Sequence, residues 1–580
     1  MEYKSQNIVC QNCKDNFTIE PEDFNFYEKM QVPAPTFCPE CRLQRRLVWR
    51  NERSLYRRKC ELCGQNIISM YSPESPFSVY CHECWWGDGW DSLKYGRDYN
   101  FSKPFFEQFK ELMLRVPRAN LIQKDVVNSP YTNWPAHIKN SYLVFGGHDI
   151  EDSAYISLRS HFLKQCFDVS YSYSSELCYQ CTNVSKCYAL AFSEDCEGCH
   201  NSFFLYDCRN CSDCFSCVGL RNKLYHIFNK PYSKEEYKKE LEKLDIKNYE
   251  SLQNLSAKFH KLLLTIPRKY AMIIQSVNVT GDDIAKAKNC HNCFSVSIDM
   301  EDCAWLWLLD RTKDSYDVSV GYLLERGYEG LSMLEGQRMQ MSVVSWGNYD
   351  VTYVDNCHDS ANLFGCEGIR NKQYCILNKQ YTKEEYEKLM PKIIEHMNTM
   401  PYVDKKGRVY KFGEFFPVEL SPSAYNETIA EEYFPLTKEE AVSQGYTWKD
   451  PEEKNYKITI STENIPDYIK DVSDEILEEI IECAHKGKCN EQCTEAFKII
   501  PDELTFYRRL SLPLPRLCPN CRHYQRLKQR NPLKLWHRTC MCEKKHVHHE
   551  GLCDIEFETS YAPDRPEIVY CEKCYQQEVY

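Results

Sequence analysis

The chain has 580 residues, 43% hydrophobic and 27% charged, a composition that excludes wholesale disorder and predicts about four folded domains. It carries 34 cysteines but no secretory signal and no apolar stretch near the roughly 18 residues that a membrane helix needs. We therefore expect a soluble, cytoplasmic protein whose cysteines are metal ligands or small buried residues rather than disulfides. The net charge of −12 hides two basic stretches, +7 over residues 42–59 and +9 over residues 504–542, which leave −28 for the rest of the chain.

Paired cysteine motifs open the chain. Two residues between cysteines let both thiolates of a tight turn face one ion, and two such pairs complete the tetrahedron of a structural zinc site. The spacing predicts two such sites in an N-terminal module of residues 1–100. The expected ligands are Cys10, Cys13, Cys38 and Cys41 for the first site, and Cys60, Cys63, Cys81 and Cys84 for the second.

A basic amphipathic helix is expected directly after Cys41, as in treble-clef folds. Its arginines fall on one helical face and its leucines on the opposite one. The same basic face recurs near the C-terminus, and guanidinium groups on a zinc-stabilised helix favour contact with phosphates. Two alternatives remain: a solvated basic face, or one that pairs with the acidic middle of this chain. The expected nucleic-acid contacts are Arg42, Arg46, Trp49, Arg50, Arg53, Arg522, Arg526 and Arg530.

The middle of the chain is duplicated as units 101–245 and 246–400. The motif Arg221-Asn222-Lys223 recurs as Arg370-Asn371-Lys372, 149 residues later. Within each unit aromatic residues recur at steps of about 10–13 residues with turn-forming residues between them, which predicts short strands stacked in a β-solenoid. Two steps per coil would give roughly 22–24 residues per turn. An antiparallel sandwich is the alternative.

Helices are expected at the borders of the repeats. Residues 105–116 and 252–266 have amphipathic patterns that each end at a proline, and we expect these helices to close the open ends of the stacks. Capping boxes at Ser233 and Thr382 begin charged helices that leave the repeats. Residues 401–482 are expected to form an acidic connector, with a capping box at Thr437 and a helix near 474–482.

A run of four cysteines in the first unit resembles the spacing of iron–sulfur ligands. In the second unit two of the four aligned positions are no longer cysteine, while the surrounding repeat is kept. This favours cysteines as small apolar residues in a narrow interior, with a cluster or third type of metal site as the alternative. The run consists of Cys208, Cys211, Cys214 and Cys217.

The C-terminal module, residues 483–580, repeats the N-terminal one and predicts two more zinc sites, which makes about four structural ions in all. The one-residue spacing after Cys540 departs from the pattern, and nearby residues are close enough to substitute as ligands. The expected ligands are Cys489, Cys493, Cys518 and Cys521, then Cys540, Cys542, Cys571 and Cys574, with Cys553, His546, His548 and His549 as substitutes.

The motifs taken together are shared with known proteins: Cys10, Cys13, Phe17, Ile19, Phe26, Tyr27, Pro35, Cys38, Cys41 and Arg42, followed by Trp85, Trp86, the Arg-Asn-Lys rungs, Cys518 and Cys521. The first ten resemble a small bacterial family known only as a "probable zinc-binding" domain of the zinc-ribbon or treble-clef-like kind. The full pattern is similar to large cysteine-rich proteins of uncultivated bacteria with small genomes. The resemblance implies zinc and this architecture, and it carries no established activity.

The sequence therefore predicts a multidomain, mainly β protein in which zinc-ribbon or treble-clef-like modules flank a duplicated β-solenoid-like middle with capping helices. We expect a non-enzymatic, zinc-binding scaffold that contacts DNA or structured RNA. One alternative is a protein–protein adaptor that uses the solenoid surface. The other is a β-solenoid hydrolase or lyase with an Asp-rich groove. The oligomeric state stays open.

Overall fold

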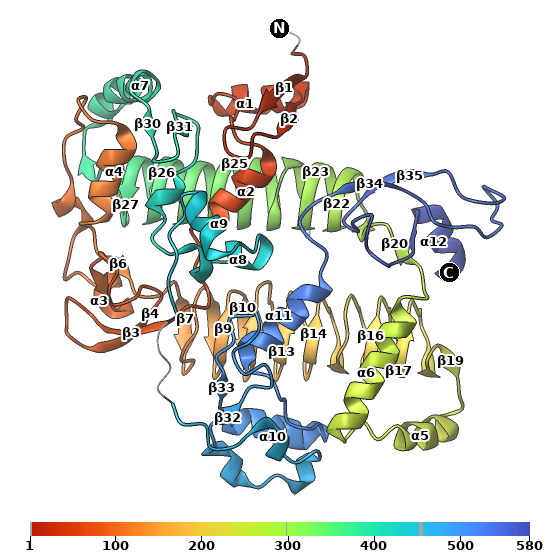
Figure 1. The fold of residues 1–580 in the computed structure, drawn as a ribbon. Helices are drawn as coiled ribbons and strands as arrows, with labels where there is room; N and C mark the ends of the chain where they lie inside the picture. Colours follow the sequence, from red (N-terminus) through yellow and green to blue (C-terminus); the bar gives the residue numbers. More distant parts are fainter. Residues whose placement is uncertain (1–2, 297–298, 452–455, 580) are drawn as a thin grey trace.

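The computed structural model describes residues 3–296, 299–451 and 456–579 (Figure 1). It is mainly β, with a β-solenoid of about 21 turns and cysteine clusters at both ends and in the middle of the chain, which confirms the expected fold class. The solenoid forms two stacks that lie side by side and run in opposite directions (Figure 1). No helix in the described part of the chain has the length and apolar character needed to cross a membrane.

The first stack winds through the first repeat unit as parallel strands, and a short hairpin with β19 (Lys230–Pro231) ends it. Its strands are β7 (Lys124–Val127), β8 (Ala136–Lys139), β9 (Tyr142–Phe145), β10 (His148–Glu151), β11 (Ala154–Ser157), β12 (Leu163–Lys164), β13 (Phe167–Ser170), β14 (Tyr179–Thr182), β15 (Tyr188–Ala191), β16 (His200–Tyr206), β17 (Ser212–Val218) and β18 (Leu224–Ile227).

The second stack repeats this arrangement and ends in the hairpin of β28 (Gln373–Ile376) and β29 (Lys379–Gln380). Its longest strand, β25 (Trp307–Trp346), runs continuously around several corners. The strands before the hairpin are, besides β25, β21 (Ile273–Ile274), β22 (Val277–Ala285), β23 (Ala287–Val296), β24 (Met300–Ala304), β26 (Tyr349–His358) and β27 (Ala361–Glu367).

One turn of the solenoid is half as long as the sequence predicts. Phe167 pairs with Tyr179 and Tyr188 pairs with His200, so most neighbouring rungs are 12 residues apart. The aromatic step is thus a whole coil rather than half of one. The backbone turns through the left-handed region at every third residue, for example at Asn201 (φ 47°). Such turns cost about 1 kcal/mol each for a residue with a side chain, which is why Asn and Asp are frequent there.

Side-chain ladders and a narrow core stabilise these corners. Asn128 donates to Asn140 (3.0 Å), and Asn140 donates to Asp152 on the next rung (3.0 Å). Inside the first stack, the four cysteines of the 208–217 run are fully buried in a core of aliphatic side chains and further cysteines, among them Cys196 and Cys199. The thiol of Cys208 donates to the carbonyl of Tyr206 at 3.5 Å. A thiol that donates to a carbonyl is neutral, which fits the packing interpretation of the run, and the metal-cluster alternative stays open.

The helices that precede the stacks do not close them. Helix α4 (Phe105–Met113) precedes the first stack but packs on β27 of the second, where Phe105 meets Phe364. Helix α6 (Tyr249–Leu263) precedes the second stack but packs on β16 and β17 of the first. Their apolar faces therefore cover sides of the stacks. The stack ends are covered by the helices that follow them, α5 (Lys234–Lys243) and α7 (Lys383–Thr399).

The terminal modules are built alike, each from two hairpins and the helices that follow them. The N-terminal module contains β1 (Gln6–Val9), β2 (Asn16–Ile19), α1 (Pro21–Met30), α2 (Pro39–Leu47), β3 (Tyr56–Lys59), β4 (Asn66–Ser69), β5 (Val79–Tyr80) and α3 (His82–Trp86). The C-terminal module contains β32 (Ile481–Glu482), β33 (Ala496–Phe497), α10 (Pro501–Leu510), α11 (Pro519–Gln529), β34 (Trp536–Thr539), β35 (Glu556–Thr559), β36 (Val569–Tyr570) and α12 (Glu572–Val579).

The remaining segments tie modules to stacks. Strand β6 (Arg118–Ala119) pairs with β5, and β20 (Arg268–Lys269) pairs with β36. The connector holds β30 (Tyr402–Val403), β31 (Val409–Tyr410), α8 (Ala430–Tyr433) and α9 (Lys438–Ser443), the last beginning at the predicted capping box of Thr437. The helix expected near 474–482 is only a 3-10 turn, Asp474–Leu477.

Candidate metal centres and their docking helices

The first cysteine cluster joins a hairpin to a helix start. Cys10 and Cys13 lie in the turn between β1 and β2, whereas Cys38 precedes α2 and Cys41 lies in its first turn. The four sulfur atoms all lie within 4.8 Å of one another. The N–H of Cys38 donates to the sulfur of Cys10 at 3.2 Å. Such donors and the positive end of a helix favour thiolates, the form that binds zinc.

The second cluster repeats this geometry between β3, β4 and α3. It contains Cys60, Cys63, Cys81 and Cys84, with sulfur atoms again within 4.8 Å of one another. Burial opposes ionisation of Cys60, but backbone N–H donors of Cys63 and Cys81 outweigh it and lower the pKa of this thiol to about 7. The cluster thus contains a thiol suited to metal binding near neutral pH.

The third cluster includes a cysteine that the sequence analysis missed. Cys483 groups with Cys493, Cys518 and Cys521, and it takes the position expected for Cys489. The N–H of Cys518 donates to the sulfur of Cys483 at 3.2 Å, as Cys38 does to Cys10. Cys489 lies in the loop between the hairpin cysteines, its sulfur 3.7 Å from that of Cys521.

A detectable signal points to Cys483. The strand β32 ends immediately before it, as β1 ends immediately before Cys10. The residues 484–492 separate Cys483 from Cys493, so the short spacing of a metal knuckle, on which the sequence prediction relied, led to Cys489 instead.

The fourth cluster also exchanges one expected ligand. Cys540, Cys553, Cys571 and Cys574 form the group of four sulfur atoms, so Cys553 takes the place expected for Cys542. Cys542 forms a second group with His546, His549 and Cys574, and His548 Nε2 lies 3.3 Å from the sulfur of Cys574. Of the residues considered as substitute ligands for one site, Cys553 thus belongs to the first group, and His546 and His549 belong to the second.

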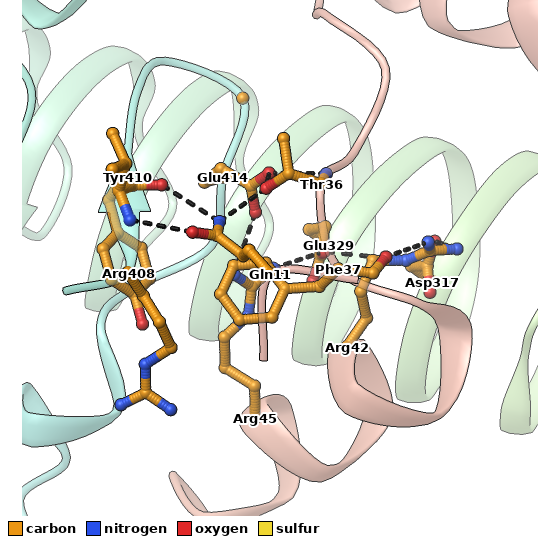
Figure 2. A network of polar contacts seen from close by, with 12 residues as sticks. Gln11, Thr36, Phe37, Arg42, Arg45, Asp317, Glu329, Arg408, Tyr410 and Glu414 are labelled. Atoms are coloured by element: carbon orange, nitrogen blue, oxygen red, sulfur yellow. Dashed lines mark hydrogen bonds and ion pairs between the residues drawn. The ribbon is translucent and has the colours of Figure 1, made fainter. Parts of the chain in front are cut away.

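The arginines of α2 face the second stack and are buried. Arg42 and Arg46 both bind Asp317, at 2.8 and 3.1 Å, and Arg46 also binds Glu329 at 3.0 Å. Arg45 bridges Glu329 (2.7 Å) and Glu414 of the connector (2.9 Å). Figure 2 shows Arg42 and Arg45 directed at the carboxylates of the solenoid and the connector.

The helix α11 repeats this docking on the first stack. Arg522 binds Asp168 of β13 at 2.6 Å and Glu503 at 3.1 Å, and Arg526 binds the second oxygen of Asp168 at 2.9 Å. Side-chain exposure is at most 2% for all four groups. Figure 1 shows α2 against one stack and α11 against the other.

The remaining predicted contacts also point inward. Trp49 and Arg50 lie beyond the end of α2 and are buried, with Trp49 packed on Phe416. Arg50 donates to Ser332 at 2.6 Å. Arg53 is half-buried and donates to Ser157, and Arg530, just after α11, donates to Ser295.

The burial of six of these eight side chains contradicts their assignment to nucleic acid, whereas for the half-buried Arg53 and Arg530 the assignment stays a prediction. Arg42, Arg46, Trp49, Arg50, Arg522 and Arg526 cannot reach a phosphate from the interior, and Arg53 and Arg530 are engaged with the protein itself. The basic faces pair with the acidic middle, which was one of the alternatives. Nucleic-acid binding by the chain as such stays a prediction.

Carboxylates keep the buried Arg45 charged. Burial lowers the pKa of Arg45, but Glu329 and Glu414 more than offset this effect and hold the pKa above its ordinary value. A buried ion pair contributes little net stability over a well-packed apolar pair, yet removing one partner leaves an uncompensated charge that costs about 3–5 kcal/mol. Each module must therefore hold its helix so that every buried arginine meets its carboxylate.

A cavity of about 260 Å³ lies in the seam between the stacks. The first stack contributes Trp134 and Leu158, the second contributes Leu308 and Trp346, and Arg50 of the N-terminal module also lines it. Arg50 stacks over the ring of Trp134 at 4.1 Å. The lining is mainly apolar and aromatic, with a few polar groups, as in sites for small ligands.

Comparisons with known proteins name no family. No family model matches the chain, and no curated protein matches it. Among solved structures, the chain is similar to one from Desulfovibrio desulfuricans G20 described as a candidate acetyltransferase, at 11% identity and a TM-score of 0.09. The match covers 47% of this chain and 73% of that one. A likeness this weak carries no argument about fold or activity.

Proposed function

We propose that the protein is a non-enzymatic scaffold in which zinc ions, bound by four cysteine clusters, shape terminal modules that fasten two β-solenoids side by side. The observation that carries this proposal is the set of buried ion pairs between α2 and Asp317 and between α11 and Asp168. Each docking helix begins at cysteines of a cluster. A change at the metal would therefore reach the seam directly.

Zinc suits the donors of these clusters. Four thiolates close a tetrahedral site and leave no position for substrate, which is typical of structural rather than catalytic zinc. The modules are short, and their hairpins have only two to four residues per strand. Such small units rarely fold on hydrophobic burial alone, so metal binding would supply much of their folding free energy.

The test combines metal analysis with proteolysis. Elemental analysis of the purified full chain should find stoichiometric zinc. Removal of the metal with a chelator should make both terminal modules sensitive to protease, while the ladder-bonded stacks resist longer. Added zinc should restore protection. Metal-free protein whose modules stay as resistant as before would contradict the proposal.

A second candidate function is the binding of a small apolar ligand in the seam cavity. The favouring observation is that both stacks and the N-terminal module line this cavity, so that it exists only in the assembled scaffold. An apolar fluorescent dye should bind at one equivalent. Val320→Trp, which fills the cavity, should abolish binding, whereas Val547→Trp at a 97% exposed position should not. Equal binding by both variants would contradict this candidate.

A further inference from the structure

The fourth cluster has an enlarged metal knuckle. In all four clusters the N–H of the first cysteine donates across the hairpin to the carbonyl two residues after the second cysteine: Cys10 to Asp15, Cys60 to Gln65, Cys483 to Glu495 and Cys540 to Ile555, at 2.7–2.9 Å. These bonds identify Cys540 and Cys553 as the counterparts of Cys60 and Cys63. The loop 541–552 is therefore an insertion into a knuckle that has only two residues, 61–62, in the N-terminal module.

This insertion carries a second set of metal ligands. Cys542, His546 and His549 have potential ligand atoms within 4.8 Å of one another and of the sulfur of Cys574. Cys574 also belongs to the cluster of Cys540, Cys553 and Cys571. One sulfur, held in α12, is thus shared by two four-ligand groups.

Hydrogen bonds orient the inserted ligands. His549 Nδ1 lies 2.8 Å from the carbonyl of Gly551, so this nitrogen carries the proton and Nε2, 3.2 Å from the sulfur of Cys574, keeps its lone pair. The loop itself is fixed by backbone bonds from Cys553 to Cys542 (2.9 Å) and from His546 to His549 (3.0 Å). The imidazole of His546 lies 3.6 Å from the carboxylate of Glu578, a partner of the kind that supports metal-bound histidine.

From this geometry we propose that the C-terminal module binds two zinc ions, with Cys574 as a bridging thiolate. The first ion is held by Cys540, Cys553, Cys571 and Cys574. The second is held by Cys542, His546, His549 and Cys574, which is a Cys₂His₂ set that suits tetrahedral zinc. Four thiolates on a single divalent ion leave excess negative charge, and a second ion beside the shared sulfur offsets it.

The inference rests on the proposed zinc scaffold and extends it to a dinuclear centre. Cys542 is fully buried, whereas His549 is partly exposed, so the second ion lies nearer to solvent than the first. We expect it to leave first when a chelator is added, and to bind again without refolding of the module.

The experiment compares the metal content of full-length variants. His546→Ala/His549→Ala should hold about one zinc ion fewer per chain than the wild type. His537→Ala serves as the control, because His537 is an exposed histidine on β34 that pairs with Glu556 and Glu558, and this variant should keep the wild-type content. Cadmium NMR of the wild type should show two mutually coupled resonances, since the coupling passes through a bridging sulfur.

The outcomes separate this inference from the scaffold proposal. Wild type and double histidine variant with equal, stoichiometric zinc would overturn the dinuclear centre and leave the scaffold intact. Loss of one ion without coupled cadmium resonances would overturn the bridging role of Cys574. A wild type without stoichiometric metal would contradict the scaffold proposal itself.

Discussion

Asp168 and Asp317 occupy the same position in the two repeat units, 149 residues apart, and each binds two arginines from a different terminal module. The N-terminal module docks on the second stack and the C-terminal module on the first. The chain thus crosses over itself, and its ends hold together the stacks that its middle forms. The pairing explains why a chain with strongly basic ends has an acidic middle.

Removing Asp317 should destabilise the protein strongly. Asp317→Ala leaves Arg42 and Arg46 without this buried carboxylate, and we expect a loss of about 3–5 kcal/mol in the free energy of unfolding. Asp314→Ala is the matched control on the same strand, because Asp314 pairs with the partly exposed Lys29 and should cost less than about 1 kcal/mol. Denaturant titration measures both, and equal losses would argue against the docking.

The two docks should fail separately. Asp168→Ala should raise hydrogen exchange in α11 while α2 keeps its protection, and Asp317→Ala should do the reverse, since each aspartate binds one helix. Hydrogen exchange with mass spectrometry resolves the two helices. Simultaneous loss of protection in both helices for either variant would show one cooperative unit instead.

The ligand exchange in the third cluster can be tested directly. Cys483→Ser should lose about one zinc ion per chain, because Cys483 takes the structural place of Cys10. Cys489→Ser should retain the full metal content, since Cys489 lies in the inserted loop. Elemental analysis compares the two, and the reverse result would restore the assignment made from sequence spacing.

His358 should make stability depend on pH. Burial, and then the charge of Arg370, lowers the pKa of this side chain to about 3, against about 6.5 in the unfolded chain. The unfolded state therefore binds the extra proton between these values, so the contribution is complete above pH of about 6.5 and is lost by about 1.4 kcal/mol per unit as the pH falls. His358→Asn should flatten this slope between neutral pH and pH of about 5 in denaturant titrations. Parallel slopes for both proteins would refute the assignment.

Some of this architecture could be predicted from sequence and some could not. The duplications, the solenoid and most cluster cysteines follow from spacing, because rungs and metal knuckles impose fixed periods. The predicted length of a solenoid turn was wrong because the spacing between aromatic residues is the same whether it spans half a coil or a whole coil. Cys483 was missed because nine residues separate it from Cys493, more than the short spacing expected of a metal knuckle.

The sequence pattern could not predict which groups the arginines of α2 and α11 contact. The amphipathic pattern of α2 shows that Arg42 and Arg46 share a face, but it does not show whether that face contacts solvent, a ligand or another part of the protein. Their partner Asp317 is more than 270 residues away along the chain. Only the folded crossing of the chain brings the charges together, and a buried basic face has the same local sequence as an exposed one.

The most direct test of the account measures how accessible the docking arginines are with and without metal. In the metal-loaded protein the reagent phenylglyoxal should modify exposed residues such as Arg57 and Arg115 and spare Arg42, Arg46, Arg522 and Arg526, as read by mass spectrometry. Chelation should make these four reactive, because helices α2 and α11 begin at the clusters. Unchanged protection of the four arginines after complete metal removal would contradict the claim that zinc shapes the modules that join the stacks.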